Sequence, residues 1–335
     1  MIAFLVRRVV LLVFVMWGLS LFTFVLSNLV PSDPARTALG FDATPSMVQQ
    51  YRRETGLDQP LPVRYELYLR NLLHGDFGNS IFTHHSVGDD LKQAVPATIE
   101  LTVVSLIFSV VVGGLIGAIG ATRRGGWMDV ATSSLPLVQL SIPIFVFGLL
   151  LLVVFYRDLG WLPYGGRLDS NLTPPDTVTG SYLLDSLFNL DLGNFKSAAG
   201  HLILPALALS NLTMAEMARI TRSTFLEVLR QDYIRSAKAK GLSRTAVLIR
   251  HALPNAAISI VTVMGLRFGY LLGGAVVTET IFAWPGLGRY AWQGAINADL
   301  NVVMGVTLVV GLMYSLINLL VDLSYTVLDP RVRVG

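Results

Sequence analysis

The side chains best suited to ionic recognition lie in one segment, 216–251, which holds eight of the 25 Lys and Arg of the chain. They are Arg219, Arg222, Arg230, Arg235, Lys238, Lys240, Arg244 and Arg250. In a helix, Tyr233, Ile234 and Ala237 would share one face, and two of the cations, three residues apart, would mark another. Two interpretations stay open. The cations could contact anionic lipid headgroups, or an exposed apolar stripe with basic flanks could dock into a groove of a partner protein.

The sequence has no recognisable catalytic motif. None of its four lysines follows a glycine, so it lacks the phosphate-binding Gly-Lys-Ser/Thr loop. Neither His-Glu-x-x-His nor Gly-x-Ser-x-Gly occurs, and the absence of cysteine excludes thiolate metal sites and disulfides. His84 and His85 are adjacent without a third ligand nearby, which favours a solvated loop. We predict no catalytic residue, metal site or cofactor in this chain.

One charge, Arg267, interrupts the otherwise uncharged stretch 252–278. Placing an arginine at the centre of a membrane span costs about 2.5 to 3.5 kcal/mol or more, so its side chain should face protein or water. It could attract a substrate carboxylate in a solute pathway, with Met264 and Phe268 beside it. It could instead form a structural ion pair or bind carbonyl groups. Glu279 is twelve residues away, roughly 18 Å along a helix.

The elements that carry these residues are hydrophobic helices. The chain has 335 residues, of which 53% are hydrophobic and 14% are charged, so a water-soluble class is excluded. Runs long enough to cross about 30 Å of hydrocarbon occupy 9–32, 101–122, 130–156, 197–215, 252–278 and 300–321. We predict an all-α integral membrane protein with six transmembrane helices. The first run is long and lacks a small-x-small cleavage site, which favours a retained anchor over a signal peptide.

The distribution of charge predicts the orientation in the membrane. The N-terminus, 123–129, 216–251 and the C-terminal tail together hold 14 Lys and Arg but only 6 Asp and Glu. The three segments that alternate with them, 31–100, 157–196 and 279–299, hold 10 basic and 16 acidic residues. Basic loops resist translocation, so both termini and the basic segment should be cytoplasmic. The net charge of +3 therefore reflects topology and gives no reason to expect a nucleic-acid partner.

The domain organisation follows from these runs. A first transmembrane helix should occupy 1–30, followed by an external subdomain at 31–100 that is too long for a simple connection. Apolar residues recur with helical period between Val63 and Leu73, so this subdomain should be small and helical. Pro96 should lie in the first turn of the second span. A transmembrane domain would fill 101–325, and a cytoplasmic tail would fill 326–335.

The basic segment resembles the cytoplasmic signature loop of the permease subunits of ATP-binding cassette (ABC) importers. Ser236-Ala237 take the two alanine places of that signature, Gly241 its glycine and Leu253-Pro254 its closing pair. Arg235 and His251 stand where the general signature has glutamate and isoleucine. The first departure is usual in the dipeptide, oligopeptide and nickel branch, whose typical form matches Asp232–Leu242 closely.

The resemblance extends over nearly the whole chain, to the B-type permeases of dipeptide transporters. The stretches that carry it are Arg7-Arg8, Gly75–Gly78, Pro96–Leu101, Thr221–Ser223, Thr278–Arg289 and Asp329–Arg331. It implies a type I ABC importer permease fold in a bacterial cytoplasmic membrane. It also implies that the following residues couple the permease to an ATPase: Tyr233, Ile234, Arg235, Ser236, Ala237, Lys238, Gly241, Leu253 and Pro254.

The resemblance further implies partners. These are a second, C-type permease, two ATPase subunits that bind ATP and Mg, an extracytoplasmic substrate-binding protein and membrane lipid. The segment around 233–245 would transmit ATPase closure as a rigid-body movement. Two alternatives from other classes remain: a stand-alone secondary carrier or channel, and an intramembrane enzyme. The solute stays open among peptides, nickel chelates, glutathione, haem and sugars.

Overall fold

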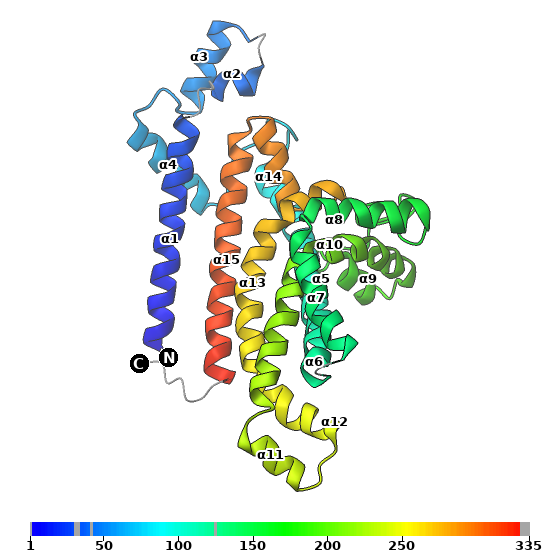
Figure 1. Ribbon diagram of the computed structural model, residues 1–335. Helices are drawn as coiled ribbons and strands as arrows, with labels where there is room; N and C mark the ends of the chain where they lie inside the picture. Colours follow the sequence, from blue (N-terminus) through cyan, green and yellow to red (C-terminus); the bar gives the residue numbers. More distant parts are fainter. Residues whose placement is uncertain (1, 30–33, 41–42, 124–125, 329–335) are drawn as a thin grey trace. The chain divides into compact units, whose positions relative to one another are not determined.

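The computed structural model describes residues 2–29, 34–40, 43–123 and 126–328 (Figure 1). Within these ranges the chain forms helices and no β-strand, which confirms the predicted all-α class. The α-helices are α1 (Ile2–Leu29), α2 (Pro34–Leu39), α3 (Pro45–Glu54), α4 (Leu61–Leu73), α5 (Val87–Phe108), α6 (Gly114–Thr122), α7 (Trp127–Ser141), α8 (Ile144–Leu151), α9 (Tyr182–Phe188), α10 (Leu192–Val228), α11 (Asp232–Ala239), α12 (Arg244–Val247), α13 (Leu253–Ile281), α14 (Leu287–Ile296) and α15 (Leu300–Leu328). Stretches of π-helix occupy Ser109–Gly113, Leu152–Asp158 and Leu248–Ala252.

The chain divides into two compact units. The first unit comprises Met1–Val95 and Arg289–Leu316, and the second comprises Pro96–Gly288 and Ile317–Gly335. In the first unit α4 packs on α1, where the ring of Phe24 lies 5.2 Å from that of Tyr65 and 5.7 Å from that of Tyr68. In the second unit α10 is the central helix and contacts α6, α7, α8, α9 and α13.

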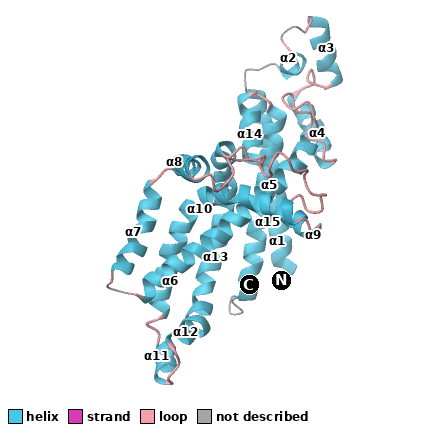
Figure 2. Ribbon diagram, turned by 90° about the vertical axis from the view of Figure 1, so that its right-hand side faces the viewer, coloured by secondary structure: helices cyan, strands magenta, loops and turns pink. Residues whose placement is uncertain are grey.

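Among the described residues, five helical segments are long and apolar enough to cross a membrane: Val6–Leu29, Val87–Thr122, Leu192–Val228, Ile260–Ile281 and Leu300–Leu323. A sixth crossing requires Trp127–Ser141 and Ile144–Asp158 to act together, and these are bent by 105° at their junction (Figure 2). A multi-pass membrane protein is thus supported, while the count of six spans stays a prediction.

The bend between α7 and α8 has a local cause. Ile142 has extended backbone angles, φ −94° and ψ 118°, directly before Pro143. A proline ring disfavours the helical conformation of the residue that precedes it. The run 130–156 carries no charge and is mostly apolar, but Pro143 breaks it into two helices.

Two helices begin earlier or end later than their apolar runs predict. The expectation that Pro96 lies in a first helical turn is wrong, because α5 begins at Val87 and Pro96 lies inside it. Asp89 and Asp90 occupy the first turn, where the positive end of the helix dipole favours acidic residues. At the other boundary α10 continues to Val228, so the first part of the basic segment is an extension of this helix.

Small residues bring α10 close to the helix formed by α5, the following π-helical residues and α6. A Cβ at Gly113 would overlap the carbonyl oxygen of Met214, and one at Gly117 would overlap that of Ala218. Glycine at both positions allows the backbones to approach, as is common between helices in membranes. These contacts help to fix α10, which leads directly into the basic segment.

Candidate coupling segment and polar networks

The segment after α10 folds into a compact pair of short helices, α11 and α12, at the ends of α10 and α13 (Figure 1). In α11, Asp232 lies in the first turn and Lys238 in the last, and each charge complements the helix dipole. Arg235 Nη2 lies 2.9 Å from Asp232 Oδ1, but both side chains are exposed. Such a surface pair contributes at most about 1 kcal/mol. The position at which α11 ends depends more strongly on Gly241, which follows the helix.

Gly241 ends α11 in a Schellman motif. Its φ is +81°, its N–H donates to the carbonyl of Lys238, and the N–H of Leu242 donates to the carbonyl of Ala237. A Cβ at Gly241 would meet no atom within 4 Å. The position therefore requires glycine for its left-handed backbone and not for close packing.

The return to the membrane-spanning part also has clear sequence signals. Ser243 caps α12 by accepting a hydrogen bond from the N–H of Ala246. The guanidinium of Arg244 donates to the carbonyl oxygen of Thr122 at the end of α6. After the π-helical stretch, Leu253 and Pro254 lie in the first turn of α13. Proline is tolerated there because the backbone N–H that it lacks would have no partner within the helix.

The predicted apolar stripe of α11 is buried against the chain itself. Ile234 has 0% exposure and Ala237 has 6%, and both belong to a core cluster with Phe225 and Val228 of α10. The expectation that these two side chains are exposed for a partner is wrong, because the chain provides their apolar environment. Val247 of α12 completes the same cluster, so α11 and α12 pack as one body on α10.

The face of α11 that remains exposed is polar and basic. Tyr233 is 43% exposed, and Arg235, Ser236 and Lys238 are also exposed. Leu253 and Pro254, where α13 begins, are exposed as well. The predicted coupling residues thus fall into three groups. Ile234 and Ala237 are buried, Gly241 provides the left-handed backbone conformation that ends α11, and the remaining side chains are exposed.

Arg267 of α13 forms an ion pair with Glu216 of α10. Its Nε lies 2.5 Å from Glu216 Oε2, and the side chains are 33% and 18% exposed. Arg267 also lies 5.6 Å from the centroid of the Tyr270 ring. An ion pair is one of the alternatives that the sequence left open for Arg267, and its partner is Glu216 and not Glu279. The pairing lowers the cost of placing either charge inside a membrane.

The two other predicted pathway residues lie near Arg267 on α13. Met264 and Phe268 are three residues before it and one after it, and the two are themselves four residues apart, so they share a helix face. Met264 packs at the edge of the core cluster that anchors α11. A movement of that cluster would therefore reach the neighbourhood of the Arg267–Glu216 pair directly.

A second ion pair ties α10 to the first turn of α7. Arg222 Nη2 lies 2.7 Å from Asp129 Oδ1, and both side chains are partly buried. This pair was not predicted from the sequence. The relevant signal was the placement of Arg222 and Asp129 in two segments predicted to lie on one side of the membrane, with opposite charges.

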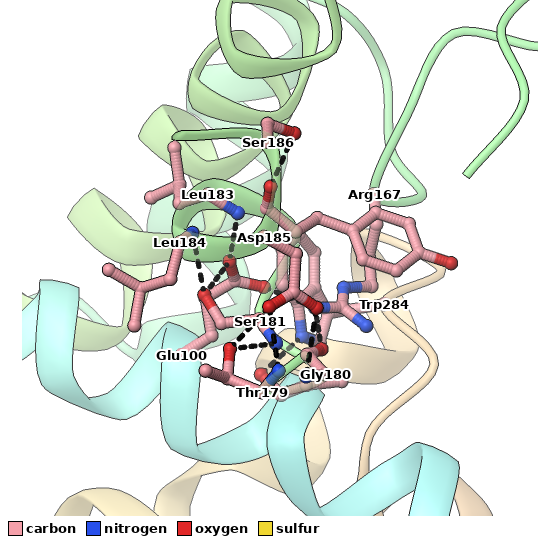
Figure 3. A network of polar contacts seen from close by, with 12 residues as sticks. Glu100, Arg167, Thr179, Gly180, Ser181, Leu183, Leu184, Asp185, Ser186 and Trp284 are labelled. Carbon is pink, nitrogen blue, oxygen red and sulfur yellow. Dashed lines mark hydrogen bonds and ion pairs between the residues drawn. The ribbon is translucent and has the colours of Figure 1, made fainter. Parts of the chain in front are cut away.

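A buried polar network holds the segment after α8 against the interior of α5 and the turn that follows α13 (Figure 3). Arg167 Nη2 lies 2.5 Å from Glu100 Oε2 and donates to the carbonyl of Gly180 at 2.8 Å. The guanidinium stacks 3.7 Å from the centroid of the Tyr182 ring and lies 5.6 Å from that of Trp284. Both charged side chains are less than a tenth exposed. The sequence analysis missed this pair because 67 residues separate its members.

Asp185 supports the same segment from α9. It accepts hydrogen bonds from the N–H and the hydroxyl of Thr179, both at 2.7 Å, and from the N–H of Gly180 at 2.9 Å. Burial by itself raises the pKa of the Asp185 carboxyl, but the hydrogen bonds from Thr179 and Gly180 outweigh it and lower the pKa below its usual value.

Glu279 has a separate role at the end of α13. The hydroxyl of Thr98 donates to Glu279 Oε1 at 2.6 Å and accepts the N–H of Leu287 at 2.7 Å. The indole N–H of Trp284 donates to the carbonyl of Ala97. Across the described ranges, no three His, Asp or Glu side chains gather where they could hold a metal ion. Through these hydrogen bonds, Thr98 and Ala97 of α5 tie down the end of α13 and the turn that follows it.

Comparison with known proteins identifies two family models along the chain. Residues 109–334 match the binding-protein-dependent transport system inner membrane component. Residues 1–102 match the N-terminal region of the membrane component of binding-protein-dependent transport systems. Together these matches cover nearly the full sequence and confirm the resemblance inferred from the signature loop.

Curated relatives are similar over their whole lengths. The dipeptide transport system permease protein DppB of Alkalihalophilus pseudofirmus is 41% identical over 333 residues, which is 99% of this chain and 100% of that protein. The probable D,D-dipeptide transport system permease protein DdpB of Escherichia coli is 44% identical, over 97% of this chain and 95% of that protein. The di/tripeptide transport system permease protein DppB of Pseudomonas aeruginosa is 41% identical over 99% of both chains.

A solved structure shares the fold at low sequence identity. A chain of the methionine ABC transporter MetNI, in an inward-facing conformation, aligns with a TM-score of 0.54 and 19% identity. The alignment covers 71% of this chain and 96% of that chain. The predicted permease architecture is thus supported by a known importer fold.

Proposed function

Because the chain belongs to the family of binding-protein-dependent transport system inner membrane components, we infer that it is a permease subunit of an ATP-driven importer of short peptides. It would form half of a translocation pathway, with a second, C-type permease forming the other half. An extracytoplasmic binding protein would deliver the peptide, and two cytoplasmic ATPases would bind ATP and Mg. The names of the relatives support di- and tripeptides as the solute class.

The observation that carries this function is the architecture of segment 232–254. Ile234 and Ala237 fix α11 to the core at the end of α10, while Tyr233, Arg235 and Lys238 stay exposed. An element that is rigidly anchored on one side and exposed on the other can transmit a push from a partner. We assign the exposed face to the ATPase and the buried face to transmission. The orientation follows, with the coupling segment and both termini in the cytoplasm.

The pathway assignment rests on the Arg267–Glu216 pair. Arg267 keeps a third of its side chain exposed beside Glu216, and a charge in a membrane span faces protein or water. Arg267 would attract the carboxylate of a passing peptide, and Met264 and Phe268 would line the same face of α13. The pairing with Glu216 keeps the site neutral when no peptide is present.

Purification and uptake together test the proposal. The tagged chain, expressed with its partner subunits, is expected to copurify with two ATPase subunits, and uptake of a labelled dipeptide into vesicles should stop when ATP is removed. A stand-alone carrier would need neither ATPase nor ATP. Uptake by the purified chain alone, driven by an ion gradient, would contradict the importer assignment.

A further inference from the structure

An unassigned groove lies in the first unit, between the C-terminal half of α1 and the N-terminal half of α15. It has a volume of about 530 Å³. Its walls are apolar apart from three hydroxyl groups and carry no charge; α1 contributes Phe22, Thr23, Leu26, Ser27 and Leu29. Further along the helices, Leu19 packs directly against Gly311, so α1 and α15 are in close contact there. The groove therefore offers an apolar channel between two membrane spans.

A polar pocket of about 240 Å³ adjoins the groove. Ser27, Leu300 and Met304 line both spaces, so the two are continuous. The polar pocket adds the charged side chains of Arg64 and Asp76, along with several amide and hydroxyl groups. The apolar groove thus opens into a pocket that is lined by one cationic side chain, Arg64, and one anionic side chain, Asp76.

Neither charge is neutralised by the other. Arg64 is partly buried, and its guanidinium makes no ion pair or hydrogen bond with the residues that the structure describes. Asp76 is exposed, and its Oδ1 accepts the N–H of Gly78 at 2.8 Å. The hydroxyl oxygen of Tyr68, which also lines the pocket, is buried. The pocket can therefore accept both an anionic and a cationic group.

The position of α4 places this chamber at a membrane surface. Tyr65 and Tyr68 of α4 pack on Phe24 of α1, and the Tyr65 hydroxyl lies 2.9 Å from Ser20 Oγ. Aromatic side chains with polar edges are typical of the boundary between hydrocarbon and water. The groove then extends from headgroup depth into the hydrocarbon, along helices that are predicted to cross the membrane.

We propose that the groove and pocket form a binding site for one phospholipid with an amine-bearing headgroup. An acyl chain would lie in the apolar channel, Arg64 would bind the phosphate and Asp76 the headgroup ammonium. A helix of another protein in this groove would leave Arg64 covered and unpaired, which is costly in a membrane. A peptide would find few polar partners along the channel. Under the orientation proposed above, the lipid belongs to the extracytoplasmic leaflet.

Photolabelling in vesicles tests the site without requiring transport. The full importer would be reconstituted in vesicles of phosphatidylethanolamine and phosphatidylglycerol that contain a trace of phosphatidylethanolamine with a photoactivatable acyl chain. Labelled peptides should come from α1 and α15. Arg64→Gln should lower this labelling roughly tenfold, because it removes a charge-assisted hydrogen bond. Asp76→Asn should lower the preference for labelled phosphatidylethanolamine over an equally labelled phosphatidylglycerol.

Matched variants separate the site from general lipid contact. Arg70 lies on the same helix as Arg64 and does not line the pocket, so Arg70→Gln should label normally. Leu26→Trp should fill the groove and reduce labelling, whereas Val25→Trp should not, although the two residues are 45% and 46% exposed. Equal labelling of Arg64→Gln and Arg70→Gln would overturn the proposal. Loss of labelling on adding excess dipeptide, or occupation of the groove by the partner permease in a cross-linking experiment from position 304, would also overturn it.

Discussion

Arg267 Nε in α13 lies 2.5 Å from Glu216 Oε2 in α10, so one ion pair joins two helices of the membrane-spanning part. The pair is close to the cluster that anchors α11, because Met264 packs on that cluster three residues before Arg267. A displacement of α11 by an ATPase would therefore shift the surroundings of Arg267, which is the only charged residue in the sequence 252–278. The Arg267–Glu216 pair thus lies where a movement of α11 would reach the proposed pathway.

Removing one partner of this pair should destabilise the chain. Glu216→Gln leaves Arg267 unpaired, and we expect a loss of about 1–3 kcal/mol, less than for a fully buried pair because Arg267 is 33% exposed. The double variant Glu216→Gln with Arg267→Gln should recover most of the stability. Thermal unfolding in detergent, followed by tryptophan fluorescence, measures both effects.

The same double variant separates structure from transport. If Arg267 attracts the peptide carboxylate, uptake should stay roughly tenfold lower even though stability returns, since a hydrogen bond to a charged group contributes about 1.5–3 kcal/mol. Uptake of a labelled dipeptide is the measurement. A stable double variant that transports with unchanged affinity and peptide preference would assign the pair a structural role alone.

Gly241→Ala should impair coupling through the backbone. An L-residue with a side chain at φ +81° costs about 1–2 kcal/mol, so the end of α11 should rearrange. Gly241→Asn should be milder, because asparagine tolerates this conformation. The ratio of peptide taken up to ATP hydrolysed by the reconstituted importer is expected to fall for Gly241→Ala.

Gly126 provides the control for that substitution. Its φ is −107°, and a Cβ there would meet nothing within 4 Å. Gly126→Ala should therefore leave coupling unchanged. If Gly241→Ala behaves like Gly126→Ala in both stability and coupling, the left-handed residue is not needed for transmission.

Arg167→Gln should loosen the segment between α8 and α9. The Arg167–Glu100 pair is buried, and breaking such a pair costs about 3–5 kcal/mol. Arg157→Gln removes an ion pair with Asp158 that is exposed to solvent, and it should leave the stability of the segment nearly unchanged. Limited proteolysis between residues 168 and 181 should become faster in the first variant only. Equal cleavage rates in the two variants would mean that the buried pair does not hold the segment.

The segment held by Asp185 should resist mild acid. The pKa of Asp185 is lowered in the folded protein, so its ionised form stabilises the fold at every pH above the unfolded value of about 3.9. That contribution is lost only as the pH falls through the lower folded value. Hydrogen exchange of the Thr179 and Gly180 amides should therefore keep its protection factors from pH 7 to pH 5. A loss of protection within that window would contradict the assignment, and Asp185→Asn should lower protection at every pH.

Much of the fold was predictable from apolar runs, and the errors have local causes. The positions of the spans follow the hydropathy of the sequence. Pro143 nevertheless bends one apolar run by 105°, because proline restricts the backbone of the residue before it, and a hydropathy value carries no information about backbone conformation. Pro96 looked like a helix start, yet Asp89 and Asp90 begin the helix earlier. Periodicity correctly grouped Ile234 with Ala237 but could not tell an internal cluster from an external partner, since both bury the same face.

Ion pairs between residues far apart in the sequence could not be predicted for the site. Gly241 and Pro254 could be located from the sequence because the backbone requirements of glycine and proline are local. The partner of Arg267 could not be named, since Glu216 lies on a different helix and only the packing of α10 on α13 brings them together. Glu100 and Arg167 were missed for the same reason.

The central claim is that the exposed face of α11 contacts an ATPase, and photo-cross-linking from Tyr233 tests it most directly. Tyr233 is 43% exposed beside the buried Ile234, so a benzophenone side chain can replace it without disturbing the core cluster. Phe188, 59% exposed on α9 in a segment predicted to be extracytoplasmic, is the matched control position. In the assembled importer we predict a covalent product with an ATPase subunit from position 233 and none from position 188. Absence of that product from position 233, in a complex that still transports dipeptide with ATP, would contradict the account.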